Sequence, residues 1–167
     1  MSLKGDPKVI ECLNDGLKKE LTAINQYFLH SRMLEDWGVT KLAKYEYDES
    51  IEEMQHADKF IQRILLLGGI PNLQHLDKLM IGEDVKEVLE CDLKLELGGI
   101  EAYRKAIKIC EDANDYVSRD LFVTILKDEE EHADHYETQL ELIKNIGIER
   151  YITLNSNALG EAAVIGE

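Results

Sequence analysis

Two short segments of the chain each place a glutamate three residues before a histidine. One segment holds Glu53 and His56, and the other holds Glu129 and His132. Residues i and i+3 of an α-helix lie on the same face, so each pair can direct a carboxylate and an imidazole toward one point. Two such pairs, with a lone glutamate from each of two other helices, form a two-metal site in some four-helix bundles.

Two further glutamates stand at matching distances from these pairs. Glu20 precedes Glu53 by 33 residues, and Glu96 precedes Glu129 by 33 residues. The whole pattern therefore repeats with an offset of 76 residues. This internal repeat indicates two helical hairpins, each of which contributes half of one site.

The predicted site has six ligands, which are Glu20, Glu53, His56, Glu96, Glu129 and His132. Four carboxylates are neutralised by two divalent cations, so the buried charges cancel when metal is present. Oxygen and imidazole ligands without a thiolate favour iron or manganese over structural zinc. Two bridged metal ions of this kind can give electrons to dioxygen or peroxide. A core in which the glutamates only pair with the histidines is disfavoured, because it leaves negative charge uncompensated.

Neighbouring residues are candidates for orienting these ligands. Asp92 lies one helical turn before Glu96, and Asp128 flanks Glu129, so either aspartate can accept the second ring N–H of a ligand histidine. Tyr27 and Tyr103 each follow a lone glutamate by seven residues and can either hydrogen-bond the carboxylates or only fill the core. The remaining histidines are expected away from the ligands, with His30 and His75 at the surface and His135 off the inward stripe.

Hydrophobic periodicity predicts an all-α chain with four long helices, over about 7–37, 40–67, 85–113 and 116–146. Three of these helices have start signals in the sequence. Asp6 before Pro7 can start the first helix, Thr40 can cap the second, and Asp84 with Glu87 forms a capping box for the third. The long connection over 68–83 can run along the bundle and make the third helix parallel to the second. Residues 148–154 are expected to form a short fifth helix, which completes a domain over 1–154, and 155–167 are expected to be a flexible tail.

Composition narrows the class of protein further. The formal charge of the 167 residues is −15 at pH 7, which disfavours nucleic acid and anionic membranes as partners. No apolar run is long enough for a membrane span, and the N-terminus lacks the apolar core of a signal peptide. Three cysteines without a C-x-x-C pair indicate free thiols and a cytoplasmic protein.

Beyond the ligands, the segments 23–30, 49–51, 71–74, 81–85 and 115–120 resemble a bacterioferritin, and the resemblance extends from about Lys4 to Tyr151. It implies a ferritin-like four-helix bundle with a long crossover and a short fifth helix. It also implies a ferroxidase that oxidises Fe(II) at a di-iron centre and stores ferric mineral in a hollow homo-oligomeric shell of 24 subunits.

The same resemblance implies a haem b shared between two subunits, with Met54 of each as an axial ligand. Leu21, Phe28, Tyr47 and Ile51 lie off the inward stripes near Met54, which predicts a dimer through this face. Without the resemblance, Met54 reads as a residue that fills an irregular interface. A ferredoxin is the implied reductant, docking near Ile70, Pro71, Leu79, Glu83 and Glu87, although Ile70 can equally pack the connection onto the bundle.

Some positions depart from the family pattern. Asp48 stands where many bacterioferritins have a histidine linked to an extra iron site, and Glu52 one turn later can still help it to bind a cation. His135 stands where some members have a tryptophan that supplies an electron. Two other functions use the same bundle, namely a di-iron peroxidase of the rubrerythrin kind and a structural or haem-carrying subunit of a mixed shell. A rubrerythrin-like peroxidase usually has C-x-x-C pairs, which are missing here. A structural or haem-carrying subunit does not need the complete set of six ligands that this chain has.

Overall fold

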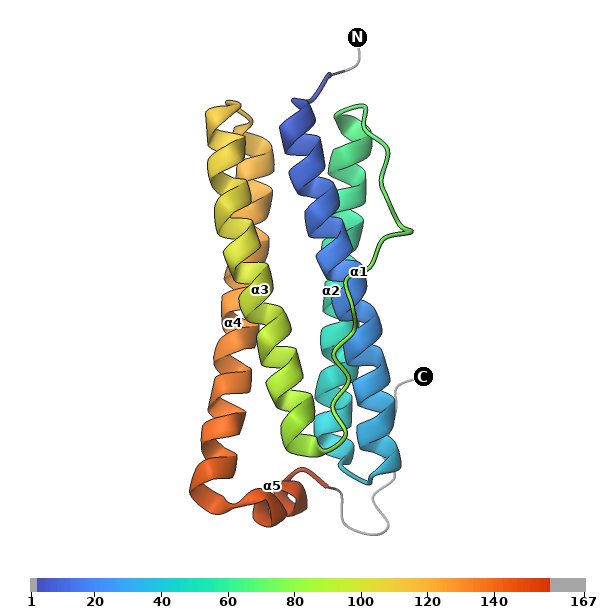
Figure 1. Cartoon of the computed structure of the whole chain (residues 1–167), viewed down its shortest axis with the longest axis vertical. Coiled ribbons are helices and arrows are strands. Elements are labelled where there is room, and N and C mark those ends of the chain that lie inside the picture. Colours follow the sequence, from blue (N-terminus) through green and yellow to red (C-terminus); the bar gives the residue numbers. More distant parts are fainter. Residues whose placement is uncertain (1–2, 157–167) are drawn as a thin grey trace.

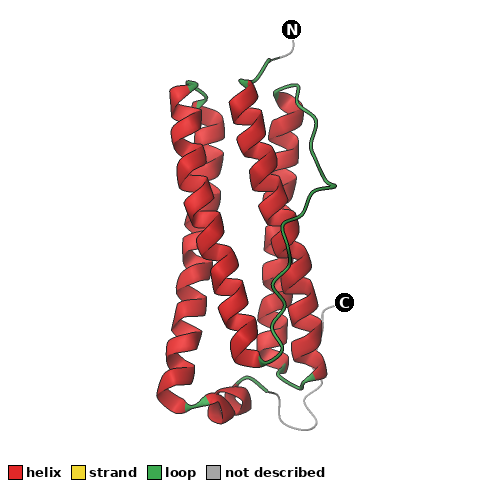
Figure 2. Ribbon diagram, in the orientation of Figure 1, coloured by secondary structure: helices red, strands yellow, loops and turns green. Residues whose placement is uncertain are grey.

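The computed structural model describes residues 3–156, and these form α-helices and loops without a strand (Figure 2). The helices are α1 (Pro7–Asp36), α2 (Thr40–Leu66), α3 (Val85–Asp112), α4 (Tyr116–Ile146) and α5 (Ile148–Leu154). These bounds confirm the four long helices and the short fifth helix expected from periodicity. No described helix is both long and apolar enough to cross a membrane. The flexible tail predicted for 155–167 lies outside the described residues except for Asn155 and Ser156.

Most helix ends follow the signals in the sequence. The Asp6 side chain accepts a hydrogen bond from the backbone N–H of Lys8 (2.8 Å), and Pro7 is the first helical residue. The prediction that Thr40 caps α2 is wrong, because the capping position belongs to Val39. Val39 is buried and its N–H bonds the carbonyl of Leu34 (2.9 Å). Side-chain burial and the end of α1 therefore set this turn.

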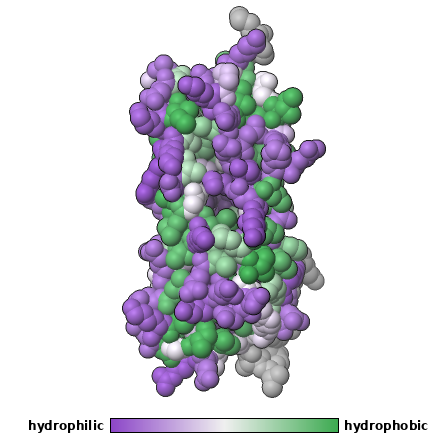
Figure 3. Space-filling view, viewed as in Figure 1, coloured by the Kyte–Doolittle hydropathy of each residue, from purple (hydrophilic) through white to green (hydrophobic). Residues whose placement is uncertain are grey.

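The long helices form two antiparallel pairs (Figure 1). α1 packs along α2, and α3 packs along α4. The connection over 67–84 returns along the length of the bundle beside α1, so α3 runs parallel to α2 as predicted (Figure 1). The face seen in the same orientation is predominantly hydrophilic, with apolar groups scattered between the polar ones (Figure 3).

The core consists of two apolar clusters with a polar layer between them. One cluster includes Leu13, Phe60 and Phe122, and the other includes Leu34, Leu89 and Ile143. On every long helix, the predicted metal ligands fall between the residues that contribute to the two clusters. The apolar packing on either side therefore holds the four helices in register around the polar layer.

Side chains of α1 hold the crossover in place by accepting its backbone N–H groups. The acceptors and donors are Asn14 for Asn72 (2.8 Å), Thr22 for Asp77 (2.9 Å), Gln26 for Met80 (3.0 Å) and His30 for Gly82 (3.0 Å). This contact corrects the expectation that His30 is at the surface, since its side chain is fully buried. The crossover covers the face of α1 that a bundle without it would leave in solvent. His75 is exposed, as predicted.

Candidate metal centre

The six predicted ligands meet in the polar layer between the apolar clusters. α1 contributes Glu20, α2 contributes Glu53 and His56, α3 contributes Glu96, and α4 contributes Glu129 and His132. None of these residues is more than 5% exposed. The layer therefore draws on all four helices, as the internal repeat predicts.

The side chains form two overlapping groups that share Glu53. The Nδ1 atom of His56 lies 3.6 Å from a carboxylate oxygen of Glu20, 3.7 Å from Glu53 and 3.4 Å from Glu129. The Nδ1 atom of His132 lies 3.3 Å from the other oxygen of Glu53 and 3.6 Å from Glu96. Within each group, one atom per residue lies within 4.8 Å of the others, which is close enough to hold a metal ion.

Most atoms that face the middle of the layer have no hydrogen-bond partner in the described structure. They include the Nδ1 atoms of both histidines, both carboxylate oxygens of Glu53, and one oxygen each of Glu20, Glu96 and Glu129. Buried polar atoms are almost always satisfied, because an unmet one costs about 1–3 kcal/mol. Seven such atoms at one place fit a site built for cations, with oxygen and imidazole donors suited to iron or manganese.

The pKa values of several candidate ligands are raised, which favours binding of protons when the site holds no cation. Burial and the negative charge of Glu20 raise the pKa of Glu53 well above its usual range. Burial and the charge of Glu96 do the same to the pKa of Glu129. Burial lowers the pKa of His56 and His132, but the close carboxylates around both rings outweigh this effect and raise both pKa values. A metal ion entering the site therefore has to displace protons.

Outer neighbours orient the ligands. The hydroxyl of Tyr103 donates a hydrogen bond to Glu20, and the hydroxyl of Tyr27 donates one to Glu96. These contacts confirm that the two tyrosines hydrogen-bond the carboxylates and do not only fill the core. Each bond occupies Oε1 of its carboxylate and leaves Oε2 of the same group buried without a hydrogen-bond partner.

Each ligand histidine has a carboxylate at its outer nitrogen. Nε2 of His56 lies 2.9 Å from Asp128, as predicted. Nε2 of His132 lies 3.0 Å from Glu49. The alternative that Asp92 serves a ligand histidine is wrong, because Asp92 is bonded to His30. Asp92 bonds to His30 because His30 is buried beneath the crossover and lies within reach of the Asp92 carboxylate.

Three buried groups near the site were not singled out from the sequence. Glu49 lies on the inward-facing side predicted for the helix over 40–67, so its burial could be predicted from the sequence. Its contact with His132 could not. Glu46 and Gln26 lie off the predicted stripes, yet both are fully buried. Only contacts between distant segments explain their burial.

A partly apolar patch lies on the outer face of α1 and α2. Met54 is 53% exposed, Phe28 is 47% exposed and Ile51 is 38% exposed. The rings of Phe28 and Tyr47 lie 6.3 Å apart, and the guanidinium of Arg32 lies over both. Met54 is thus exposed on the outside of the bundle and is not part of the ligand layer.

Asp48 and His135, which stand at the positions that depart from the family pattern, contact Lys44 and Tyr45. Asp48 forms an ion pair with Lys44 (2.5 Å), while Glu52 lies 3.4 Å from Nε2 of His132. His135 stacks on Tyr45 with ring centroids 3.8 Å apart. The three cysteines are free, as predicted.

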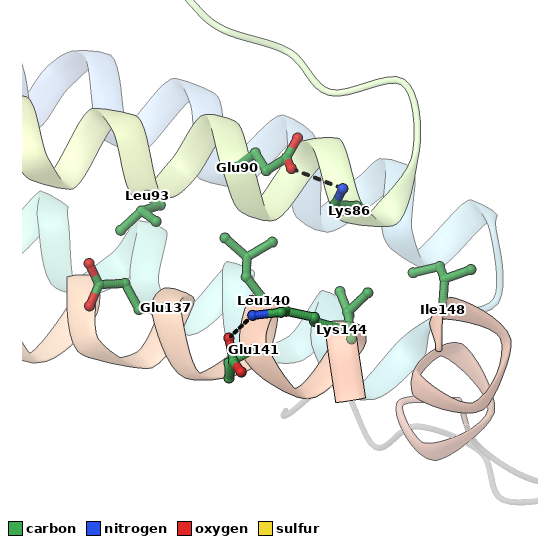
Figure 4. A pocket seen from close by; sticks show the side chains of 9 residues that line it. Lys86, Glu90, Leu93, Glu137, Leu140, Glu141, Lys144 and Ile148 are labelled. Carbon is green, nitrogen blue, oxygen red and sulfur yellow. Dashed lines mark ion pairs between the residues drawn. The ribbon is translucent and has the colours of Figure 1, made fainter. Parts of the chain in front are cut away.

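A groove between α3 and α4, close to α5, is a poorer candidate for a metal site (Figure 4). Leu93, Leu140 and Ile148 line it together with charged residues. Its two lysines form ion pairs within their own helices, Lys86 with Glu90 (3.4 Å) and Lys144 with Glu141 (3.5 Å). The groove therefore lacks a converging set of free carboxylates.

Comparisons with known proteins agree with this geometry. A family model described as a ferritin-like domain matches residues 10–146. The bacterioferritin of Brucella melitensis is 56% identical over 160 residues, which cover 96% of this chain and 99% of that protein. The bacterioferritin of Rhodobacter capsulatus is 50% identical over the same shares, and that of Streptomyces coelicolor is 46% identical over 90% of each chain. The chain therefore belongs to the bacterioferritin family of ferritin-like, iron-storage proteins.

Proposed function

We propose that the chain is a ferroxidase subunit that oxidises Fe(II) to Fe(III) at the six-ligand layer. The observation that carries this proposal is the pair of overlapping ligand groups that share Glu53 and leave their inward atoms unpaired. Glu20, Glu53, His56 and Glu129 would hold one iron ion, and Glu53, Glu96 and His132 would hold the second. When bound, the two ions supply electrons for the reduction of dioxygen or peroxide.

The protein's own part in this reaction is positioning and charge balance. Tyr103 and Tyr27 hold Glu20 and Glu96 in one orientation, and Asp128 does the same for His56. The apolar clusters on both sides exclude water from the layer, which strengthens the attraction between the carboxylates and Fe(II). Protons on Glu53 and Glu129 leave as the cations enter.

The wider assembly is part of the same proposal. Residues 1–154 act as one domain, and copies of it pair through the patch around Phe28, Ile51 and Met54 before building a hollow 24-subunit shell in the cytoplasm that stores ferric mineral. A haem b would lie at this pairing surface, held by Met54 of each copy, and would supply electrons to the stored mineral. A ferredoxin that docks near the exposed Ile70, beside Pro71, Leu79, Glu83 and Glu87, would be the reductant.

The test is aerobic addition of Fe(II) to metal-free protein, followed by size-exclusion chromatography and an iron assay. The proposal predicts that ferric iron elutes with a large assembly of the chain. Iron that precipitates outside the protein fraction, or a chain that elutes as a 19.1 kDa monomer, would overturn it. A reaction that proceeds with peroxide and not with dioxygen would instead support the peroxidase alternative.

A further inference from the structure

A small cavity lies beside the metal layer, on the side where α1 and α3 pack against each other. Its volume is about 20 Å³, and the candidate ligands that line it are all glutamates, namely Glu20, Glu53, Glu96 and Glu129. Neither ligand histidine is among the described residues that line it. Since each ligand group includes a histidine nitrogen, the cavity is displaced from the places between the ligand atoms and lies on the carboxylate side of the layer.

The other walls of the cavity are mostly apolar and buried. Tyr27, Tyr103 and Ala23 line it, and the hydroxyls of both tyrosines are already bonded to ligand carboxylates. Among the residues that line it, only Lys19 and Leu95 are partly exposed. The cavity is therefore reached from outside the bundle past these two residues, between α1 and α3.

Gly99 of α3 leaves the space for this cavity. It is a buried glycine inside a helix, where alanine would be the more stable choice. A Cβ atom at this position would lie 3.3 Å from Oε2 of Glu129 and 4.0 Å from Cε2 of Tyr103, and both residues line the cavity. The neighbouring Gly98 is exposed, and a Cβ atom there would meet nothing within 4 Å. Only at Gly99 does the missing side chain affect the site.

The size and charge of the cavity limit what it can hold. About 10–15 Å³ is enough for one water molecule, so a molecule of two oxygen atoms fits and one that carries an alkyl group does not. Each of the four glutamates has at least one buried oxygen without a hydrogen-bond partner in the described structure. Their negative charges disfavour an anion. A neutral molecule of two oxygen atoms is therefore the best match.

We propose that this cavity holds the oxidant, and that Gly99 restricts the oxidant to dioxygen or hydrogen peroxide and excludes alkyl hydroperoxides. The inference rests on the proposed function, which supplies the redox step. Two Fe(II) ions lose one electron each. Dioxygen takes both electrons with two protons from water and becomes hydrogen peroxide, or hydrogen peroxide takes them, its O–O bond breaks and two water molecules form. Gly99 acts only by leaving room beside the carboxylates.

The first test compares Gly99→Ala with its matched control, Gly98→Ala. The added methyl group overpacks the cavity, so the initial rate of Fe(II) oxidation by dioxygen or hydrogen peroxide should fall by about 10- to 100-fold in Gly99→Ala. Gly98→Ala should keep the wild-type rate. Stopped-flow absorbance measures both. A Gly99→Ala protein that oxidises Fe(II) at the wild-type rate overturns the role of the cavity.

Metal binding by Gly99→Ala separates a blocked cavity from a damaged ligand set. The new methyl group approaches Oε2 of Glu129, whereas Oε1 is the oxygen that lies 3.4 Å from Nδ1 of His56. The variant should therefore bind Zn2+, a redox-inert probe, with the wild-type stoichiometry in calorimetry. Loss of Zn2+ binding would show that Gly99 only makes room for Glu129, and would overturn its role toward the oxidant.

The choice of oxidant is tested with hydrogen peroxide and tert-butyl hydroperoxide. Each oxidation rate is divided by the rate of the same peroxide with Fe(II) in buffer, which corrects for intrinsic reactivity. The wild-type protein should favour hydrogen peroxide by about tenfold or more, because the alkyl group does not fit. Equal ratios for the two peroxides overturn the size restriction.

Nitric oxide, a neutral diatomic molecule, gives a readout that does not depend on oxidation. Titrated without oxygen into Fe(II)-loaded protein, it should produce a visible absorption band at similar concentrations in the wild type and Gly98→Ala. Gly99→Ala should need about 10-fold more nitric oxide or beyond. Bound Fe(II) without this band in the wild type overturns the cavity as a ligand site. Wild-type protein that binds Fe(II) and nitric oxide but oxidises no Fe(II) contradicts the proposed function instead and supports the cavity.

Discussion

Glu53 faces both histidines of the metal layer, with one oxygen 3.7 Å from Nδ1 of His56 and the other 3.3 Å from Nδ1 of His132. Its carboxyl group has no hydrogen-bond donor of its own among the described residues. By contrast, Glu20 and Glu96 each have one oxygen held by a tyrosine. In the proposed site, Glu53 would therefore serve both cations, whereas Glu20 and Glu96 would each serve one.

The contact between Asp128 and His56 leads to a prediction for metal affinity. Asp128→Asn weakens the acceptor that orients the His56 ring, so the affinity for Fe(II) or Zn2+ should fall by about 10- to 100-fold. Isothermal titration calorimetry measures this change. Asp134→Asn is the matched control, because Asp134 is an exposed aspartate of the same helix. Equal affinities for the two variants would contradict the orienting role of Asp128.

The pKa shifts of the ligands predict how metal binding depends on pH. The pKa values of Glu53, Glu129, His56 and His132 are all raised, so these groups keep their protons to a higher pH than they would in water, and a cation has to compete with those protons. Affinity for a divalent cation should therefore rise with pH, and binding should release protons. Calorimetry in two buffers of different ionisation enthalpy counts the protons released. Affinity independent of pH between 6 and 8 contradicts the assignment of these protons.

At the scale of elements, the crossover depends on α1 for its position. The hydroxyl of Thr22 accepts the N–H of Asp77 and donates to the carbonyl of Lys18. Thr22→Val should lower the free energy of unfolding by about 1 kcal/mol and speed hydrogen exchange at the amide of Asp77. Chemical denaturation and exchange mass spectrometry measure the two effects.

Thr124→Val is the control for this prediction. Thr124 also donates its hydroxyl to the carbonyl four residues earlier, but it is exposed and makes no bond to the crossover. It should leave exchange at Asp77 unchanged. Similar exchange at Asp77 in both variants would mean that the Thr22 contact does not hold the crossover.

The helices and the convergence of the six candidate ligands could be predicted because both depend on local spacing. Burial of Glu20 and Glu53 follows from the helical period and the internal repeat, and Asp128 adjoins a ligand in the chain. The partners of His30, Glu46 and Asp92 could not be predicted, because they come from distant segments. His30 is covered by a crossover with no periodic pattern, so nothing in the period of α1 distinguishes it from a surface residue.

At the scale of the whole molecule, the exposed patch around Met54 should be a pairing surface that binds haem. Met54→Leu keeps the volume and apolar character of the side chain but removes the sulfur ligand. The variant should retain the fold, the dimer and iron uptake while losing the haem absorbance band. Visible spectroscopy and analytical ultracentrifugation after haem reconstitution measure these properties.

Met33→Leu is the matched control for haem binding, since Met33 lies on α1 and is not part of the patch. It should bind haem like the wild-type protein. A Met54→Leu protein that keeps the wild-type haem spectrum would show that the axial ligand lies elsewhere.

The central claim is that the two halves of the repeat build one oxidation site, and stopped-flow measurement of initial Fe(II) oxidation tests it most directly. His56→Ala and His132→Ala should each abolish the rapid phase to a similar extent, because each removes the only nitrogen ligand from one of the two groups that share Glu53. Circular dichroism should show an intact helical fold in both variants. A folded His132→Ala protein that oxidised Fe(II) at the wild-type rate would contradict the two-metal site.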